Sequence, residues 1–157
     1  MLKIFFSYVV LLVIITLMQG CNQDSDNYLD GSITDSYDMG FDSVRIRSYP
    51  ATALSVEYIA TGDHGEKIPL RVTIDKDAVD IKTGVEYSFL KDATIARGAG
   101  YDSSPLPDLD SGSVTLSEYS VESGSVTKGS FSAVFISSTG SKLNLRGDFS
   151  GNLEVVE

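Results

Sequence analysis

The sequence has very little of several residue types that carry chemistry. Its 157 residues include no tryptophan, one cysteine, Cys21, and one histidine, His64. A single cysteine cannot form a disulfide within the chain. A Ser-His-Asp triad would have to use His64, which lies in a "TGDHGE" turn, and the chain has no G-x-S-x-G elbow. A zinc site would also lack ligands. We therefore expect no metal, no cofactor and no enzyme of these classes.

Basic residues and long apolar runs are scarce as well. The chain has 12 basic against 22 acidic residues, a net charge of −10, whereas a nucleic-acid-binding protein needs a basic face to meet phosphate. We therefore expect no nucleic-acid partner. The one long apolar run, residues 4–18, falls short of the roughly 20 residues that span a bilayer as a helix. With Lys3 before it and Gly20 after it, this run predicts a signal peptide over residues 1–20.

The end of this segment carries a motif. The stretch "MQGC" at residues 18–21 resembles the lipobox of bacterial lipoproteins, with Met18 where leucine is usual and Gln19 where alanine or serine is commoner. The resemblance implies that the Cys21 sulfur is acylated and that lipid anchors the mature chain to a bilayer. Asn22 follows in place of aspartate, which by analogy with enterobacterial lipoproteins favours the outer membrane. Ordinary signal cleavage, leaving a free Cys21 thiol, is the alternative.

The stretch after the cysteine is acidic. Six aspartates and no lysine or arginine occur between residues 22 and 42. Like charges and sparse apolar residues extend a chain, so residues 21–42 are predicted to form an acidic flexible linker. Ile33 and Tyr37 are available for packing, which leaves a short strand around residues 32–37 as an alternative. The folded domain is predicted over residues 43–157.

The predicted domain is dominated by strand patterns. Apolar and polar residues alternate in short runs rich in β-branched and aromatic residues, and turn-forming residues separate the runs. The runs are residues 43–49, 53–60, 68–74, 85–89, 114–116, 131–136, 142–147 and 149–156. Residues 75–80, "DKDAVD", favour one helical turn at most. The pattern predicts an all-β fold, an antiparallel β-sandwich or small barrel of about eight or nine strands.

The final third, residues 112–156, looks like the tails of several uncharacterised secreted bacterial β domains. The shared pattern is a G-x-F-x-A strand, a turn and an L-x-G-x-F strand, matched by Gly129, Phe131, Ala133, Leu145, Gly147 and Phe149. The resemblance implies two adjacent hairpins and brings no known activity. The spacing suits glycines at bulges or tight bends.

Candidate binding residues fall in the stretch of residues 98–112, predicted as the longest loop, because long loops on β scaffolds commonly bind ligands. Tyr101 beside Asp102 is the first candidate. Asp108 and Asp110 form an incomplete calcium pattern, and capping of turns is the simpler interpretation.

These observations predict a location better than an activity. We expect a non-enzymatic, membrane-anchored lipoprotein whose β domain binds or scaffolds an unknown periplasmic or surface partner. A small-ligand or glycan-binding lipoprotein is the alternative. A hydrolase that uses two carboxylates is a third hypothesis, because 22 acidic residues offer many pairs and no informative one.

Overall fold

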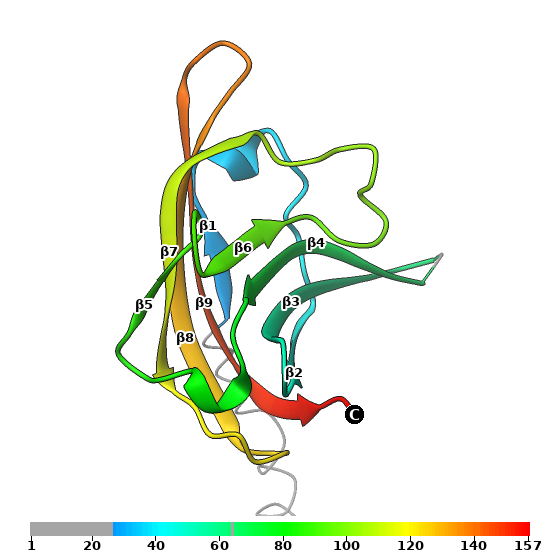
Figure 1. The fold of residues 1–157 in the computed structure, drawn as a ribbon. Helices are drawn as coiled ribbons and strands as arrows, with labels where there is room; N and C mark the ends of the chain where they lie inside the picture. The colour runs from blue at the N-terminus through cyan, green and yellow to red at the C-terminus, as the bar shows by residue number, and fades with distance from the viewer. Residues whose placement is uncertain (1–26, 64) are drawn as a thin grey trace, which may run out of the picture.

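The computed structural model describes residues 27–63 and 65–157, which form a nine-stranded mixed sheet nearly closed into a barrel (Figure 1). The all-β prediction is confirmed, as a barrel and not a sandwich. Cys21, the predicted signal peptide and His64 lie outside the described residues. The strands are β1 Tyr28–Asp30, β2 Ser43–Tyr49, β3 Ala53–Gly62, β4 Gly65–Ile74, β5 Glu86–Ser88, β6 Ala93–Ala96, β7 Asp108–Glu118, β8 Val126–Ile136 and β9 Lys142–Val155. Two 3-10 turns accompany them, η1 Ser32–Asp35 and η2 Ala78–Asp80.

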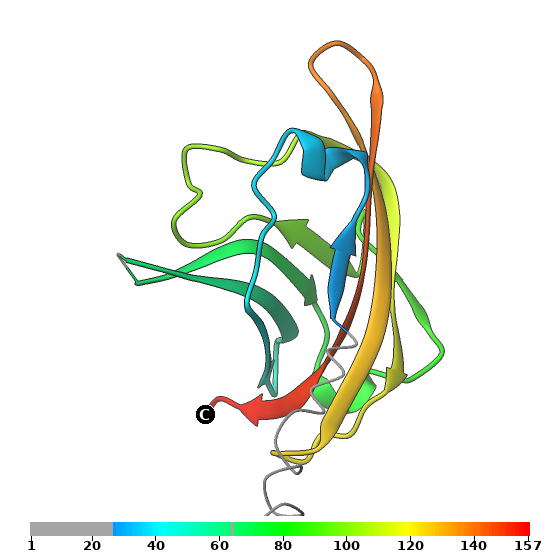
Figure 2. The ribbon, with the colours of Figure 1, turned by 180° about the vertical axis from the view of Figure 1, so that it is seen from behind.

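The sheet is organised around β9. The strand order is β5-β7-β8-β9-β2-β3-β4-β6, and β1 pairs with β9 outside this path. β8 runs along one edge of β9, while β1 and β2 occupy successive parts of the other edge (Figure 2). The β2–β9 pair is parallel, with Ile46 opposite Leu153, so the prediction of a purely antiparallel sheet is wrong for this pair. A tight turn imposes antiparallel pairing on strands adjacent in sequence, and β2 and β9 are far apart.

The predicted strands largely match those observed. The run at 43–49 coincides with β2, and the "DKDAVD" stretch contains the single turn η2. The two runs at 142–147 and 149–156 merge into β9 because no turn separates them. Two short strands, β1 and β6, were not predicted, since three or four residues show too little alternation.

Two glycines of the C-terminal pattern make room for aromatic rings. Gly129 lies opposite Phe149, and Gly147 opposite Phe131, in unbroken register between β8 and β9. A Cβ on Gly129 would lie 2.5 Å from Phe149 Cζ, and one on Gly147 would lie 2.7 Å from Phe131 Cε1. The two adjacent hairpins are confirmed, but the placement of these glycines at bulges or tight bends is wrong. Each glycine leaves space in the core for the ring across from it.

The core is crossed by a line of aromatic rings. Phe41 packs edge-on against Tyr58 with ring centroids 4.9 Å apart, and Tyr58 approaches Phe131 at 6.2 Å. Phe131 approaches Phe89 at 6.4 Å. Tyr58 is fully buried, and its hydroxyl donates a 2.8 Å hydrogen bond to the carbonyl oxygen of Asp148. The line joins β3 to β8 across the barrel.

Replacing Tyr58 with phenylalanine is expected to change the alkaline stability. Burial, followed by the charge of Asp148, raises the pKa of Tyr58 above its usual value of 10. The unfolded chain therefore loses this proton first, and the stabilisation is complete below pH 10 and lost as pH rises above it. Above pH 10 the free energy of unfolding is expected to fall by up to about 1.4 kcal/mol per pH unit because of this group. The Tyr58→Phe variant has no ionisable hydroxyl and does not show this decrease. At neutral pH the variant is expected to lose about 1 kcal/mol with its hydrogen bond.

Urea unfolding at intervals from pH 7 to pH 11.5 measures this difference. The difference in free energy of unfolding between wild type and Tyr58→Phe is constant to pH 10 and shrinks above it. If the free energies of unfolding of wild type and Tyr58→Phe change in parallel above pH 10, the raised pKa of Tyr58 is wrong.

The acidic stretch before β2 is folded onto the barrel. β1 pairs with β9, and the side chain and backbone amide of Ser32 in η1 bond the Asn144 Oδ1 atom at 2.9 and 2.7 Å. Ile33 is fully buried and Met39 nearly so. The flexible-linker prediction for residues 21–42 is therefore wrong over residues 27–42, because these apolar side chains reach the core. The alternative strand at 32–37 is instead the turn η1.

The outer face of β2–β4 carries a cluster of arginines around one buried carboxylate. Glu57 on β3 is only 3% exposed, and its oxygens lie 2.8 Å from Arg45 Nη2 and 2.7 Å from Arg71 Nη2. Arg47 Nη1 lies 4.0 Å away. Glu66 binds the far side of Arg45 at 2.9 Å. One carboxylate thus links three neighbouring strands from the outside of the barrel.

Candidate binding surface

A row of polar side chains crosses five strands of the barrel. Cross-strand register places Glu86 on β5 beside Thr115 on β7, then Ser130 on β8, Asp148 on β9 and Tyr28 on β1. Residues in register share a face, and their neighbours along each strand point into the core, so this row faces outward. Four strand spacings give it a length of about 19 Å.

Rows on either side extend this polar face. Ser113 and Ser132 are in register with each other, and Arg146 on β9 continues their row to Asp30 on β1. The Arg146 Nε atom lies 3.1 Å from Asp30 Oδ2. The hydrogen bond from Arg146 and its charge lower the pKa of Asp30, but both side chains are more than half exposed, so this ion pair contributes little stability.

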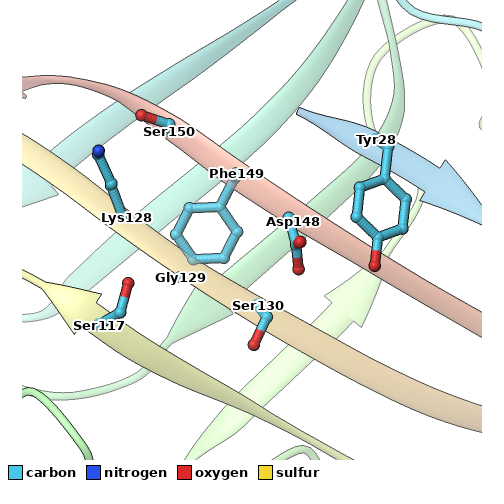
Figure 3. Close-up of a pocket in the computed structure, with 8 residues that line it drawn as sticks. All are labelled: Tyr28, Ser117, Lys128, Gly129, Ser130, Asp148, Phe149 and Ser150. Atoms are coloured by element: carbon cyan, nitrogen blue, oxygen red, sulfur yellow. The ribbon is translucent and has the colours of Figure 1, made fainter. Parts of the chain in front are cut away.

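The face is hollowed where the sheet twists. One hollow of about 530 Å³ is lined by Tyr28, Ser117, Lys128, Gly129, Ser130, Asp148, Phe149 and Ser150 (Figure 3). A second of about 450 Å³ shares Tyr28, Ser130 and Asp148 with the first and continues toward Glu86. We call the two hollows together the hydroxyl groove. The Phe149 ring lies on the core side of Gly129, so the groove has bare backbone at this point (Figure 3).

The groove offers hydrogen bonds from many directions. Serine and threonine hydroxyls both donate and accept, and the groove adds two cationic groups, of Lys128 and Arg146, and two carboxylates, of Glu86 and Asp148. Tyr28 is 42% exposed and supplies an aromatic surface at the β1 side. Glu86 and Asp148 lie three strand spacings apart, about 14 Å between backbones. The arrangement offers hydrogen bonds and one aromatic face to a polar ligand.

The predicted residues Tyr101 and Asp102 lie elsewhere, at one end of the barrel. Both line a cleft of about 370 Å³. The Tyr101 ring stacks on the Arg97 guanidinium, whose Cζ lies 3.7 Å from the ring centroid, and its hydroxyl lies 3.1 Å from Asp38 Oδ2. Arg97 also donates to the backbone carbonyl of Asp38. These contacts fasten the β6–β7 loop to the segment before β2.

The structure separates the other two predicted residues from this cleft. Asp108 lines a different hollow, of about 470 Å³, beyond Pro105–Pro107, and Asp110 accepts a 3.2 Å bond from Lys142. Both aspartates belong to β7, so the loop is 97–107 and not 98–112, and the turn-capping interpretation is wrong. The strand β7 begins at residue 108, immediately after Pro105 and Pro107.

The hydroxyl groove was not predicted from the sequence. The serines and threonines that line it occupy alternate positions of β7 and β8. This pattern is equally typical of an ordinary solvated strand face. The groove appears only once the register aligns Thr115 with Ser130 and Asp148, and pairing register is not visible in any single strand.

Comparisons with known proteins gave no match: no protein-family model, curated protein or solved structure corresponds to this chain. Over residues 27–63 and 65–157, no three histidine, cysteine, aspartate or glutamate side chains gather in a way that could hold a metal ion. In the same residues no helix is both long and apolar enough to cross a bilayer.

Proposed function

We propose that this protein is a non-enzymatic outer-membrane lipoprotein, anchored through Cys21, that binds a glycan in the hydroxyl groove. The row from Glu86 to Tyr28 carries the proposal, because it presents hydrogen-bonding side chains in a continuous line across five strands. A glycan is a chain of sugar rings that carry hydroxyl groups at their edges and have apolar faces. Hydroxyl side chains match the first feature, and the exposed ring of Tyr28 matches the second.

The composition of the groove favours a glycan over a folded protein. The centre of a protein–protein interface is depleted in charge and rich in aromatic and apolar side chains. The first hollow instead combines three serines with Lys128 and Asp148, and Tyr28 is the one ring exposed on it. A protein partner, the first expectation from the sequence, is the alternative that the experiment below distinguishes.

The anchor is supported by the sequence alone. The "MQGC" stretch at residues 18–21 and the apolar run before it match a lipoprotein signal. Asn22 after the cysteine supports the outer membrane over the inner one. The folded residues that follow would then hold the groove close to a membrane surface, where cell-envelope glycans are found.

Replacing Tyr28 with alanine is expected to weaken glycan binding about tenfold, because truncating an exposed aromatic contact at a binding site costs on the order of 1–2 kcal/mol. The measurement is retention on an array of bacterial polysaccharide fragments, followed by titration calorimetry with the fragment retained best. Tyr101→Ala is the matched control, since it removes a tyrosine at the end of the barrel. This control is expected to bind as tightly as wild type.

Two results would contradict the proposal. One is an array on which wild type retains no fragment more strongly than Tyr28→Ala does. The other is equal weakening by Tyr28→Ala and Tyr101→Ala, which would move the site out of the groove. Affinity purification that recovers a single protein partner, with no retained glycan, would favour the scaffolding alternative.

A further inference from the structure

The chain between the proposed lipid and the barrel is short. Asn27, the first described residue, follows Cys21 by six positions. Six residues reach about 20 Å even when fully extended. Strand β9 alone, with 14 residues, is about 46 Å long. An anchor at Cys21 therefore holds the part of the barrel around Asn27 within about 20 Å of the bilayer.

The contact between Asn27 and β9 identifies the part of the barrel that is held. The Asn27 Oδ1 atom accepts a 2.6 Å hydrogen bond from the backbone amide of Ser150. Two residues further along β9, about 7 Å, Asn152 pairs with Val126 at the start of β8. In the other direction, Lys142 lies eight residues away, about 26 Å, near the turn between β8 and β9.

Exposed apolar side chains gather at the nearer end. We call this the anchor end, made of η2, residues 119–126 and the end of β9, which lie together in Figure 1. The Tyr119 hydroxyl donates to the carbonyl of Ala78 in η2 at 3.2 Å, and Gly124 donates to the carbonyl of Leu153 at 2.7 Å. Three valines project from this end, with exposed fractions of 72% for Val79, 47% for Val121 and 39% for Val126.

We propose that the anchor end rests on the membrane surface, with its three valines in the interfacial layer and the Arg97–Tyr101 end facing away. The inference rests on the lipid anchor of the proposed function. A tether of about 20 Å also allows the barrel to lie on its side, with the hydroxyl groove against the lipid. That orientation would press Lys128, Asp148 and Arg146 against lipid, whereas the anchor end presents apolar side chains.

This orientation deepens the proposed function. The groove then opens parallel to the membrane surface. Ser150 and Lys128 lie nearest the lipid headgroups, and Glu86 and Ser132 lie farther from the membrane. A glycan attached to the membrane surface can enter the groove without the barrel turning over. Asp77, Asp80 and Glu122 also lie at the anchor end, so a zwitterionic bilayer is the appropriate surface for a test.

The lack of tryptophan makes the orientation measurable. Two single-tryptophan reporters, Val121→Trp at the anchor end and Thr139→Trp in the β8–β9 turn, are introduced into the full chain. The acylated protein is purified from membranes and reconstituted in phosphatidylcholine vesicles that contain a headgroup spin-labelled lipid. We expect the Val121→Trp emission to be shifted to the blue by contact with the bilayer interface and to be quenched by the spin label, and the Thr139→Trp emission to be the same in labelled and unlabelled vesicles.

A second set of variants tests the valines. In the Val121→Trp reporter, the added changes Val79→Ser and Val126→Ser are expected to reduce quenching, because they remove the apolar contact. Leu90→Ser is the matched control, since Leu90 is 65% exposed and lies in the turn after β5, which is not one of the segments that make up the anchor end. This control is expected to leave quenching unchanged.

The outcomes separate the orientation from the anchor. Equal quenching of both reporters, or stronger quenching of Thr139→Trp, would overturn the orientation. A protein absent from the membrane pellet would overturn the anchor itself. In that case the Cys21 thiol is coupled to a maleimide phospholipid, which supplies the lipid chemically, and the two reporters still decide the orientation.

Discussion

Replacing Cys21 with alanine is expected to move the protein completely from the membrane pellet to the soluble fraction. Each buried CH₂ of an acyl chain contributes about 0.8 kcal/mol, and two or more chains hold a protein on a bilayer essentially permanently. Three exposed valines cannot replace such chains, since fully burying one valine side chain contributes only about 1.5–3 kcal/mol. Once the proposed signal peptide over residues 1–20 is cleaved, a chain without the proposed acylation site has too little affinity for a stable attachment.

The measurement is fractionation of cells that express the tagged full chain, with a carbonate wash to remove peripheral proteins. Asn22→Gln is the control, because it changes the neighbouring residue and keeps the sulfur. Labelling with an alkyne analogue of palmitate is expected to mark wild type and Asn22→Gln, and not Cys21→Ala. If Cys21→Ala stays in the pellet in the wild-type proportion, the lipid anchor is wrong.

The second large effect concerns the buried carboxylate on the outer face. Replacing Glu57 with glutamine is expected to lower the free energy of unfolding by about 3 kcal/mol. The Glu57 side chain is 3% exposed and meets guanidinium groups of Arg45 and Arg71. A neutral amide of the same shape removes the buried counter-charge of Arg71 and leaves Arg45 with the exposed Glu66, while the exposure of both arginines to water limits the loss.

Glu66→Gln is the matched control for this experiment. Glu66 accepts a hydrogen bond from Arg45 at 2.9 Å, the same distance as the bond from Arg45 Nε to Glu57. Its side chain is 56% exposed, however, and exposed ion pairs contribute about 0–1 kcal/mol. Urea unfolding followed by circular dichroism measures both variants at neutral pH. Equal losses for the two variants would show that burial of Glu57 is not what makes its ion pairs strong.

The sequence predicted the fold class because strands with one buried face alternate strictly. The run at 43–49 shows this clearly: Ile46 and Ser48 are buried, and Arg45 and Arg47, which alternate with them, remain partly exposed. Glu57 obeys the same alternation on β3 but is buried on the outer face, since arginine side chains from both neighbouring strands cover it. No property of β3 alone distinguishes this glutamate from an ordinary exposed one.

Interactions between distant residues explain the remaining errors. Residues 27–42 contain many aspartates and few apolar residues, so their local composition predicts an extended chain. Ile33 is nevertheless buried, and Ser32 bonds Asn144, a partner 112 positions away. The hydroxyl groove depends on similar long-range pairing, because its rows join β1 at the start of the domain to β9 at its end. Local patterns cannot show which strands will be neighbours.

The central position of β9 has a consequence for the order in which the barrel forms. Three strands, β1, β2 and β8, need residues 142–155 as their partner. During synthesis the first two wait for more than ninety residues before that partner exists, and contacts so far apart in sequence form slowly. If the chain is exported from its N-terminus, as the proposed function requires, this order keeps the barrel from closing before the last strand has crossed. Closure follows when the last strand arrives.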